Sequence, residues 1–232
     1  MTNGSQDYAL PLMRILITAG PSSEPIDEVR VITNRSTGEL GTVLAERMAR
    51  AGHTVEMLLG RGATFHWSEA KSFDTNDELK RLFVEIFQPE TVDVVFHIAA
   101  LADFRVSRIE INRKRQLVPK IASDAGPVWL ELIPQSKLIA GLRNYFPKAR
   151  IIGWKYEHGI TRDELLSEAS RQMQQHRTNA CVVNGRAFGS GFGVCTKAGL
   201  IATCDSKLAL AEFFVSWISE HHSADPPNDG DK

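Results

Sequence analysis

The chain has 232 residues, 43% of them hydrophobic, and its 27 Lys and Arg against 28 Asp and Glu give a formal net charge of −1. This length and apolar content are enough for one substantial core, so we expect a single domain over 13–222 between disordered tails at 1–12 and 223–232. The near-zero charge argues against nucleic-acid binding, and the absence of a long apolar run argues against a membrane protein. Three cysteines without metal or redox spacing fit a reducing cytoplasm.

Short β-rich runs alternate with helical patterns along most of the chain. This alternation predicts an α/β fold of Rossmann-like, three-layer type, with a mainly parallel sheet flanked by helices. The predicted strands are 15–18, 54–59, 92–98, 128–132, 150–154 and 180–183. The predicted helices are 39–51, 76–87, 135–145, 162–175 and 206–219. Gly52 is placed to end the first helix, and Thr75 with Glu78 and Thr161 with Glu164 have the spacing of capping boxes.

Two segments do not follow this alternation. Residues 105–126 are long, basic and weakly periodic, and we expect a long flexible loop there, because loops of that length are usually functional or disordered. Residues 185–196 contain four glycines. They have two interpretations of about equal weight: a flexible contact for a nucleotide base, or a turn before a terminal β-hairpin over 194–203.

A long polar segment between the first strand and the first helix ends in Gly38-Glu39-Leu40-Gly41. Ser36, Thr37 and Gly38 precede the predicted helix, where free backbone N–H groups and the helix dipole favour a phosphate. The segment is too long for the usual dinucleotide fingerprint, in which the glycines follow the strand within a few residues. The alternative is a helix start whose glycines serve only close packing.

Four blocks, in the same order along the chain, resemble the phosphopantothenoylcysteine synthetase family, the phosphopantothenate–cysteine ligases of coenzyme A biosynthesis. They are the segment from Thr18 to Gly41, which contains E-P-I-D-E-V-R-V-I-T-N, then A-A-L-A-D-F-R at 99–105, K-I-A-S-D at 120–124 and L-E-L-I-P-Q-S-K-L-I at 130–139. The resemblance implies a ligase that joins phosphopantothenate to cysteine through an acyl-nucleotidyl intermediate. It uses Mg²⁺ with CTP or ATP as co-substrate and releases pyrophosphate and a nucleoside monophosphate.

The resemblance also implies the site residues, position by position. The catalytic ones are Asn34, which contacts the activated acyl group, and Lys120, which covers the reacting phosphate. The nucleotide is bound by Gly20, Ser36, Gly38, Gly41, Asp103, Trp154 and Asn184. The substrate is bound by Arg30, Asn34, Ala99, Ala100 and Asp103. Judged by residue type alone, Asn34 and Asp103 also suit turns or caps, and Lys120 suits an exposed surface.

The resemblance has consequences for partners and cofactors as well. Arg30 matches an arginine that reaches substrate in the neighbouring subunit, so a homodimer is implied. Many bacterial relatives carry an N-terminal flavin-dependent decarboxylase. Because only about a dozen residues precede the first predicted strand, we expect the stand-alone form of the ligase and no flavin. The metal ligands are not identified by the resemblance.

Several positions depart from the family pattern, and most of them belong to the expected nucleotide site. They are Pro21-Ser22 for Gly-Thr, Ala122-Ser123 for Lys-Lys, Trp154-Lys155-Tyr156 for Phe-Ala-Ala, and Gly185 for Asp. CTP is favoured over ATP because the first block looks bacterial. Two other functions compete with the ligase. One is an NAD(P) oxidoreductase, in which Arg61 would bind the 2′-phosphate, and the other is a non-catalytic nucleotide-binding homologue.

Overall fold

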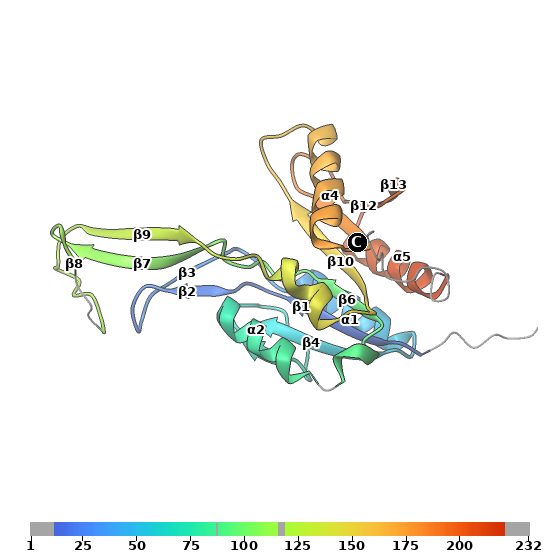
Figure 1. Cartoon of the computed structure of the whole chain (residues 1–232), viewed down its shortest axis with the longest axis horizontal. Helices are drawn as coiled ribbons and strands as arrows, with labels where there is room; N and C mark the ends of the chain where they lie inside the picture. The colour runs from blue at the N-terminus through green and yellow to red at the C-terminus, as the bar shows by residue number, and fades with distance from the viewer. Residues whose placement is uncertain (1–11, 87, 116–118, 221–232) are drawn as a thin grey trace, which may run out of the picture.

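The computed structural model describes residues 12–86, 88–115 and 119–220. Residues 1–11 of the predicted tail at 1–12, the whole predicted tail at 223–232, and residue 87 of a predicted helix lie outside the described residues. Its centre is an eight-stranded sheet in the order β13-β12-β11-β10-β6-β1-β4-β5 (Figure 1). The parallel strands are β5 (Lys71–Phe73), β4 (Thr54–Gly60), β1 (Arg14–Ala19), β6 (Val94–His97), β10 (Arg150–Tyr156) and β11 (Ala180–Asn184). The antiparallel hairpin of β12 (Phe192–Thr196) and β13 (Gly199–Cys204) continues the sheet. The mainly parallel sheet and the terminal hairpin were both predicted correctly.

Helices cover both faces of this sheet, because successive residues of its buried strands point to opposite faces. Along β1, Ile15 and Ile17 belong to one core and Leu16, between them, to the other. One face is covered by α1 (Glu39–Arg50) and α5 (Lys207–Glu220). The other is covered by α2 (Asn76–Glu85), the short η2 (Leu138–Gly141) and α3 (Leu142–Tyr145), and α4 (Arg162–His176). A single turn, η1 (Pro89–Thr91), precedes β6. The three-layer arrangement is confirmed.

Most helix ends follow the predicted signals. Thr161 and Glu164 form a complete capping box, and Gly52 follows α1 with a φ of 94°. The helix predicted over 135–145 is wrong in its first part, because the backbone N–H of Gln135 donates to the carbonyl of Asp103 and prolongs the extended chain. Within the described part of the chain, no helix is both long enough and apolar enough to cross a membrane.

Two segments leave the sheet together and form an extension that we call the arm (Figure 1). The first segment is residues 23–33, and the second is described over residues 104–115 and 119–134. The remainder of the described chain is called the body. The arm contains the hairpin of β2 (Ser23–Pro25) and β3 (Val31–Thr33), and an antiparallel sheet of β7 (Phe104–Ile111), β8 (Lys114–Arg115) and β9 (Val128–Pro134). The side chain of Glu24 joins the two parts by accepting a hydrogen bond of 3.0 Å from the N–H of Val106.

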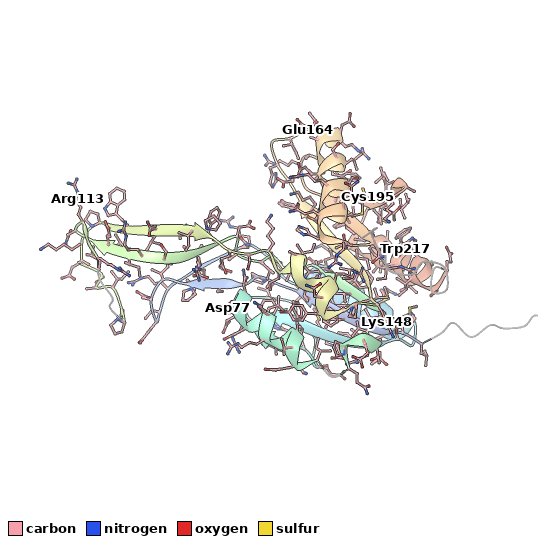
Figure 2. The ribbon with its side chains drawn as sticks, viewed as in Figure 1. Asp77, Arg113, Lys148, Glu164, Cys195 and Trp217 are labelled. Carbon is pink, nitrogen blue, oxygen red and sulfur yellow. The ribbon has the colours of Figure 1, made fainter. Side chains whose placement is uncertain are left out.

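The arm corrects two predictions. Residues 105–115 are mostly strand rather than loop, and 128–132 is a strand that lies outside the parallel sheet. The cause is exposure, since most residues of β7 and β9 are exposed or only partly buried. A strand with both faces near solvent needs no apolar run. Figure 2 shows side chains packed between the layers of the body, whereas those of the arm, such as Arg113 near its tip, point outward.

Candidate functional site

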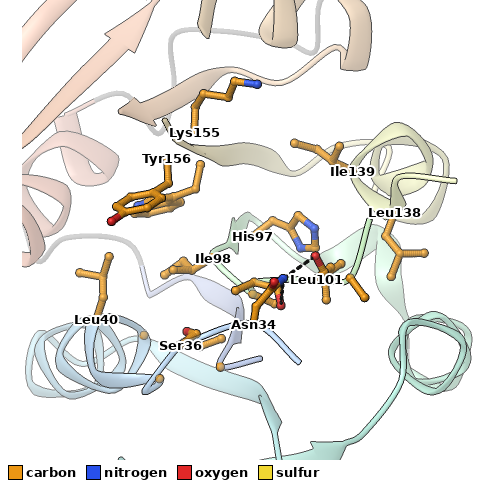
Figure 3. Close-up of a pocket in the computed structure, with 18 of the residues that line it drawn as sticks. Asn34, Ser36, Leu40, His97, Ile98, Leu101, Leu138, Ile139, Lys155 and Tyr156 are labelled. Carbon is orange, nitrogen blue, oxygen red and sulfur yellow. Dashed lines mark hydrogen bonds between the residues drawn. The ribbon is translucent and has the colours of Figure 1, made fainter. Parts of the chain in front are cut away.

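A cavity of about 920 Å³ opens at the carboxyl ends of β1, β6, β10 and β11. Ligands of open α/β sheets bind at this edge, where the loops leave the strands. The cavity is lined by most of the predicted site residues, namely Gly20, Asn34, Ser36, Gly38, Gly41, Ala99, Ala100, Asp103, Trp154 and Asn184. Figure 3 shows the part of it around Asn34. Two predicted site residues in the described chain, Arg30 and Lys120, do not line it.

One end of the cavity is the N-terminus of α1. Gly38 occupies the N-cap position with a φ of 78° and, as a glycine, supplies no side chain to cap the helix. The N–H of Glu39 donates a long hydrogen bond of 3.4 Å to the hydroxyl of Thr37. The remaining N–H groups of the first turn and the helix dipole suit an anion at this end of the cavity.

The glycines of this end also serve close packing. A Cβ on Gly41 would lie 2.3 Å from the Cβ of Ala19, and a Cβ on Gly38 would lie 2.9 Å from the Cβ of Ala63. Any side chain at position 41 would push α1 away from β1. The two interpretations of the glycines are thus compatible, since the packing sets the position of the anion site.

The loop after β6, residues 99–102, is held by side chains from three other parts of the chain. The N–H of Ala102 donates to the hydroxyl of Ser22 at 2.8 Å, and the amide of Asn76 donates to the carbonyl of Ala102 at 2.8 Å. The amide nitrogen of Asn34 donates to the carbonyls of Ala100 at 3.2 Å and Leu101 at 2.8 Å (Figure 3). This loop is consequently fixed before any ligand binds.

These contacts determine how the amide of Asn34 is oriented. Both carbonyl oxygens are acceptors, so the nitrogen must face them and the oxygen Oδ1 must point elsewhere. In the absence of ligand, the two N–H groups of Asn34 are thus engaged with the loop. The roles of Ser22 and Asn76 were missed in the sequence. Ser22 belongs to the Pro21-Ser22 departure from the family pattern, and its hydroxyl holds the loop as the acceptor of the Ala102 N–H.

His97 is a further cavity residue that sequence reasoning missed. It ends β6, lines the cavity and is only 7% exposed, with its Nδ1 2.8 Å from the hydroxyl of Thr18. Burial lowers the pKa of His97 to about 4, so the imidazole is neutral at pH 7. The available signal was a histidine at the end of the apolar run Val94-Val95-Phe96.

Three lysine–carboxylate pairs stand around the cavity: Lys207 with Glu39, Lys155 with Glu157 at 3.0 Å, and Lys137 with Asp103 at 4.0 Å. These lysines supply positive charge where an anionic ligand would lie. Among the described residues, no group of three or more His, Cys, Asp or Glu side chains is arranged to hold a metal ion.

At the end of the cavity away from α2, two buried polar atoms have no hydrogen-bond partner within the described residues. They are the indole Nε1 of Trp154, a donor, and the Oδ1 of Asn184, an acceptor. Buried polar groups are rarely left unpaired, so these atoms are suited to a polar ligand. The glycine-rich segment nearby forms the turn before β12, and Gly185, Gly189 and Gly191 have positive φ values.

Arg30 and Lys120 lie on the arm, close to each other. The N–H of Ile121 donates to Asp27 at 3.1 Å, and the guanidinium of Arg30 donates to the same carboxylate and to the carbonyl of Ile121. The Ile121 N–H, with further help from those of Val29 and Arg30, lowers the pKa of Asp27 to about 2. We call this group, Asp27 with Arg30 and Ile121, the arm clip. It brings the arginine and the exposed Lys120 together, but outside the cavity of their own chain.

The structure disfavours a dinucleotide site. Arg61 is ion-paired with Asp74 at 2.8 Å and does not line the cavity. The loop after β4, where a dinucleotide's ribose would lie, is packed against Pro21: a Cβ on Gly60 would lie 2.0 Å from the carbonyl oxygen of Pro21. Pro21 thus occupies the space that the oxidoreductase hypothesis requires.

Comparison with known proteins gives the family. Residues 10–213 match the family model described as the DNA/pantothenate metabolism flavoprotein C-terminal domain. The coenzyme A biosynthesis bifunctional protein CoaBC of Thermococcus kodakarensis is 32% identical over 179 residues, which are 76% of this chain and 42% of that protein. A second CoaBC, from Methanocaldococcus jannaschii, is 28% identical over 89% of this chain and 50% of its own length. The chain spans about half the length of these curated relatives.

A solved structure supports the fold. The DNA/pantothenate metabolism flavoprotein from Streptococcus pneumoniae has a TM-score of 0.77 and 24% identity, and the match covers 90% of this chain and 100% of that one. A more distant structure, the Cab2 mutant H337A in complex with phosphopantothenate-cysteine, has a TM-score of 0.67 and 16% identity over 90% of this chain and 86% of its own. Together with the extent of the family match, these similarities establish that the chain belongs to the family of DNA/pantothenate metabolism flavoprotein C-terminal domains.

Proposed function

We propose that this chain is a cytoplasmic phosphopantothenate–cysteine ligase of coenzyme A biosynthesis. The proposal is supported by the family match and by the relatives that are named as coenzyme A biosynthesis proteins. The observation that carries it is the cavity, in which an uncapped helix N-terminus lies in the same space as the loop that Asn34 holds. A site for phosphate beside a site for an acyl group is what this reaction requires.

In the first half-reaction, a carboxylate oxygen of phosphopantothenate attacks the α-phosphorus of CTP or ATP, and pyrophosphate leaves. In the second half-reaction, the amine of cysteine attacks the acyl carbon, the C–N bond forms, and the nucleoside monophosphate leaves with the electrons of the C–O bond. Neither step needs a protein nucleophile. The chain's part is to position anions and neutralise their charge, for which the N-terminus of α1 and the cationic side chains of Lys137 and Lys207 are placed.

The donor set of the cavity fits Mg²⁺ that arrives with the nucleotide. Mg²⁺ usually keeps several waters and binds one or two carboxylates together with substrate phosphates. Glu39 lies in the first turn of α1 and Asp103 follows the 99–102 loop, so these are the carboxylates that would hold it, while their present partners Lys207 and Lys137 would turn to the phosphates. When bound, the ion neutralises charge on the phosphates.

The position of Lys120 and Arg30 on the arm supports a homodimer in which each arm completes the cavity of a second copy. Both residues lie outside the cavity of their own chain and beside one another. The arm also exposes large apolar side chains that a partner would cover, including Trp129 at 62% and Phe104 at 50% exposure. In this proposal Lys120 covers the reacting phosphate and Arg30 contacts phosphopantothenate in the partner's cavity.

The direct test is pyrophosphate release from CTP or ATP with Mg²⁺ and phosphopantothenate, followed by amide formation when cysteine is added. In this proposal the amide of Asn34 turns one N–H from the loop carbonyls to the acyl oxygen when the substrate is bound. Asn34→Asp should therefore damage the second step more than the first, because a carboxylate has no N–H donor for the acyl oxygen and repels its developing charge. The expected result is an acyl-nucleotide that accumulates and that cysteine discharges slowly.

Asn76→Asp is the matched control. Asn76 also donates from its amide nitrogen to the 99–102 loop, so this variant disturbs the loop from the other side. If both variants lose both steps equally, Asn34 serves only to hold the loop. If folded wild-type protein releases no pyrophosphate with any nucleotide, the ligase proposal is wrong and the chain is a non-catalytic nucleotide-binding homologue.

A further inference from the structure

Tyr156, the last residue of β10, is a large aromatic side chain that lines the cavity and is 60% exposed. In Figure 3 its ring and Leu40 of α1 lie on opposite sides of the open space, with Ser36 near Leu40. The ring meets His158 in a T-shaped pair, with the centroids 4.8 Å apart and the planes at 85°. Because most of Tyr156 stays exposed beside this contact, aromatic surface is offered to the cavity across from an apolar side chain.

The position of this ring depends on a glycine in the neighbouring strand connection. Tyr156 is paired in register with Asn184 of β11, and Gly185 follows with a φ of 100°. A Cβ on Gly185 would lie 2.7 Å from the carbonyl oxygen of Glu157 and 3.2 Å from a carbon of the Tyr156 ring. A side chain at position 185 would displace the ring and the backbone beside it. The exposed tyrosine and the glycine therefore form one arrangement, in which the missing side chain at position 185 leaves room for the ring.

The surroundings of the ring indicate what it binds. The unpartnered Nε1 of Trp154 and Oδ1 of Asn184 belong to the same two strand ends, and both residues line the cavity. Leu40 belongs to the first turn of α1, whose N-terminus suits phosphate. A ligand with phosphates at α1 and a flat polar ring between Tyr156 and Leu40 would use all of these features, and a nucleoside triphosphate has that shape.

We infer that Tyr156 is the stacking residue for the nucleobase and that it makes the chain accept purine and pyrimidine nucleoside triphosphates with similar affinity. Stacking tolerates any base, because every base presents a π-face. The donor Nε1 of Trp154 and the acceptor Oδ1 of Asn184 match the ring nitrogen and amino group of cytosine and of adenine alike, and no side chain extends from position 185 to distinguish the two bases. The inference rests on the proposed function for its reaction, but it concerns binding and is tested by binding.

The experiment measures dissociation constants by calorimetry in the presence of Mg²⁺, with CTP, ATP and inorganic tripolyphosphate as probes. Wild type is compared with Tyr156→Ala, which removes the ring, and with Tyr156→Phe, which keeps it. We expect wild type to bind CTP and ATP within about tenfold of each other. Tyr156→Ala should weaken both by about 5- to 150-fold, the range expected for one base–aromatic stack, whereas Tyr156→Phe should stay close to wild type. Binding of tripolyphosphate, which has no base, should not change.

Several results would overturn the inference: unchanged nucleotide binding in Tyr156→Ala, weakening of only one nucleotide, or equal weakening of tripolyphosphate, which would indicate general damage to the cavity. A wild type that binds no nucleotide would overturn it as well. Circular dichroism and thermal unfolding establish that each variant is folded. Pyrophosphate release is measured separately. A chain that binds nucleotides through Tyr156 but releases no pyrophosphate would contradict the proposed ligase and leave this inference standing.

Discussion

The body and the arm carry different parts of the candidate site, and they hold them differently. In the body, residues far apart in sequence, such as Ser22 and Ala102, are joined by hydrogen bonds around a buried sheet. In the arm, Arg30 and Lys120 stand on exposed strands and connections with little core beneath them. The difference indicates that the chain builds its candidate anion site in the packed body and carries two further cations on an exposed extension.

The largest expected effect concerns the arm. Lys120→Ala should reduce turnover by roughly a hundred- to thousandfold, the usual cost of one preorganised charge-stabilising donor, without lowering the melting temperature. Lys114→Ala, an exposed lysine of β8, is the control and should be nearly as active as wild type. Steady-state pyrophosphate release measures both. A fully active Lys120→Ala would mean that the lysine is only a surface residue.

Mixing two inactive variants sharpens the comparison between the regions. If the arm of one copy serves the cavity of another, Lys120→Ala mixed in equal amounts with Asn34→Asp forms some dimers with one intact composite site. After subunit exchange, activity should return to about a quarter of the wild-type value. No recovery would be expected if each arm served its own cavity. That result would contradict the proposal that the arm of one copy completes the cavity of the other.

The second effect concerns the body and its pH dependence. His97 has a pKa of about 4 in the folded chain, below its ordinary value near 6.5, so the unfolded chain binds its proton first as pH falls. The stability that neutral His97 confers is complete above about pH 6.5 and is lost as pH falls toward 4. Between pH 7 and 5 the free energy of unfolding should drop by about 2 kcal/mol from this group alone.

Denaturant unfolding of wild type and His97→Gln at pH 7, 6 and 5 checks this. The glutamine does not titrate, so the variant should lose less stability than wild type over the same range, whatever its stability at pH 7. Identical pH dependence in the two proteins would show that the imidazole is not buried in its neutral form.

The smallest effect is expected at the arm clip, whose pH dependence has the same sign as that of His97 but lies in a more acidic window. The pKa of Asp27 is depressed, so its stabilising contribution is present above the ordinary value near 4 and is lost only as pH falls through about 2. Hydrogen exchange in residues 119–126, corrected for intrinsic rates, should therefore be as slow at pH 5 as at pH 7. Asp27→Asn should speed it severalfold at pH 7. Asp74→Asn, which breaks an ion pair of the body, should not.

The sequence predicted the body well because burial leaves a pattern. Ile15, Leu16 and Ile17 face two cores and must all be apolar, so their strand is visible without other information. The residues around the cavity were predicted through the family blocks. Ser22, Asn76 and His97 were missed, because each acts through a partner distant in sequence and no local pattern marks such a pair.

The arm was predicted poorly for the complementary reason. Its strands pair with each other and do not pack on the core of the body, so β7 shows neither a buried run nor clean alternation. The basic residues of this segment suggested a flexible loop. They are compatible with an antiparallel pair of strands, because β7 and β9 satisfy each other's backbone hydrogen bonds. Strands as exposed as β7 and β9 leave no burial pattern in the sequence by which they could be recognised.

The close approach of Gly41 to Ala19 has a consequence for protein engineering. Gly41 has no side chain and Ala19 has only a methyl group, so α1 packs directly on β1. The distance between the N-terminus of α1 and the sheet is therefore set by this contact and not by the surrounding loops. Tyr156 ends another strand, β10, and lies across the cavity from Leu40 of α1. Libraries that vary position 156 are therefore expected to change the affinity for nucleotides while the register of the phosphates stays constant.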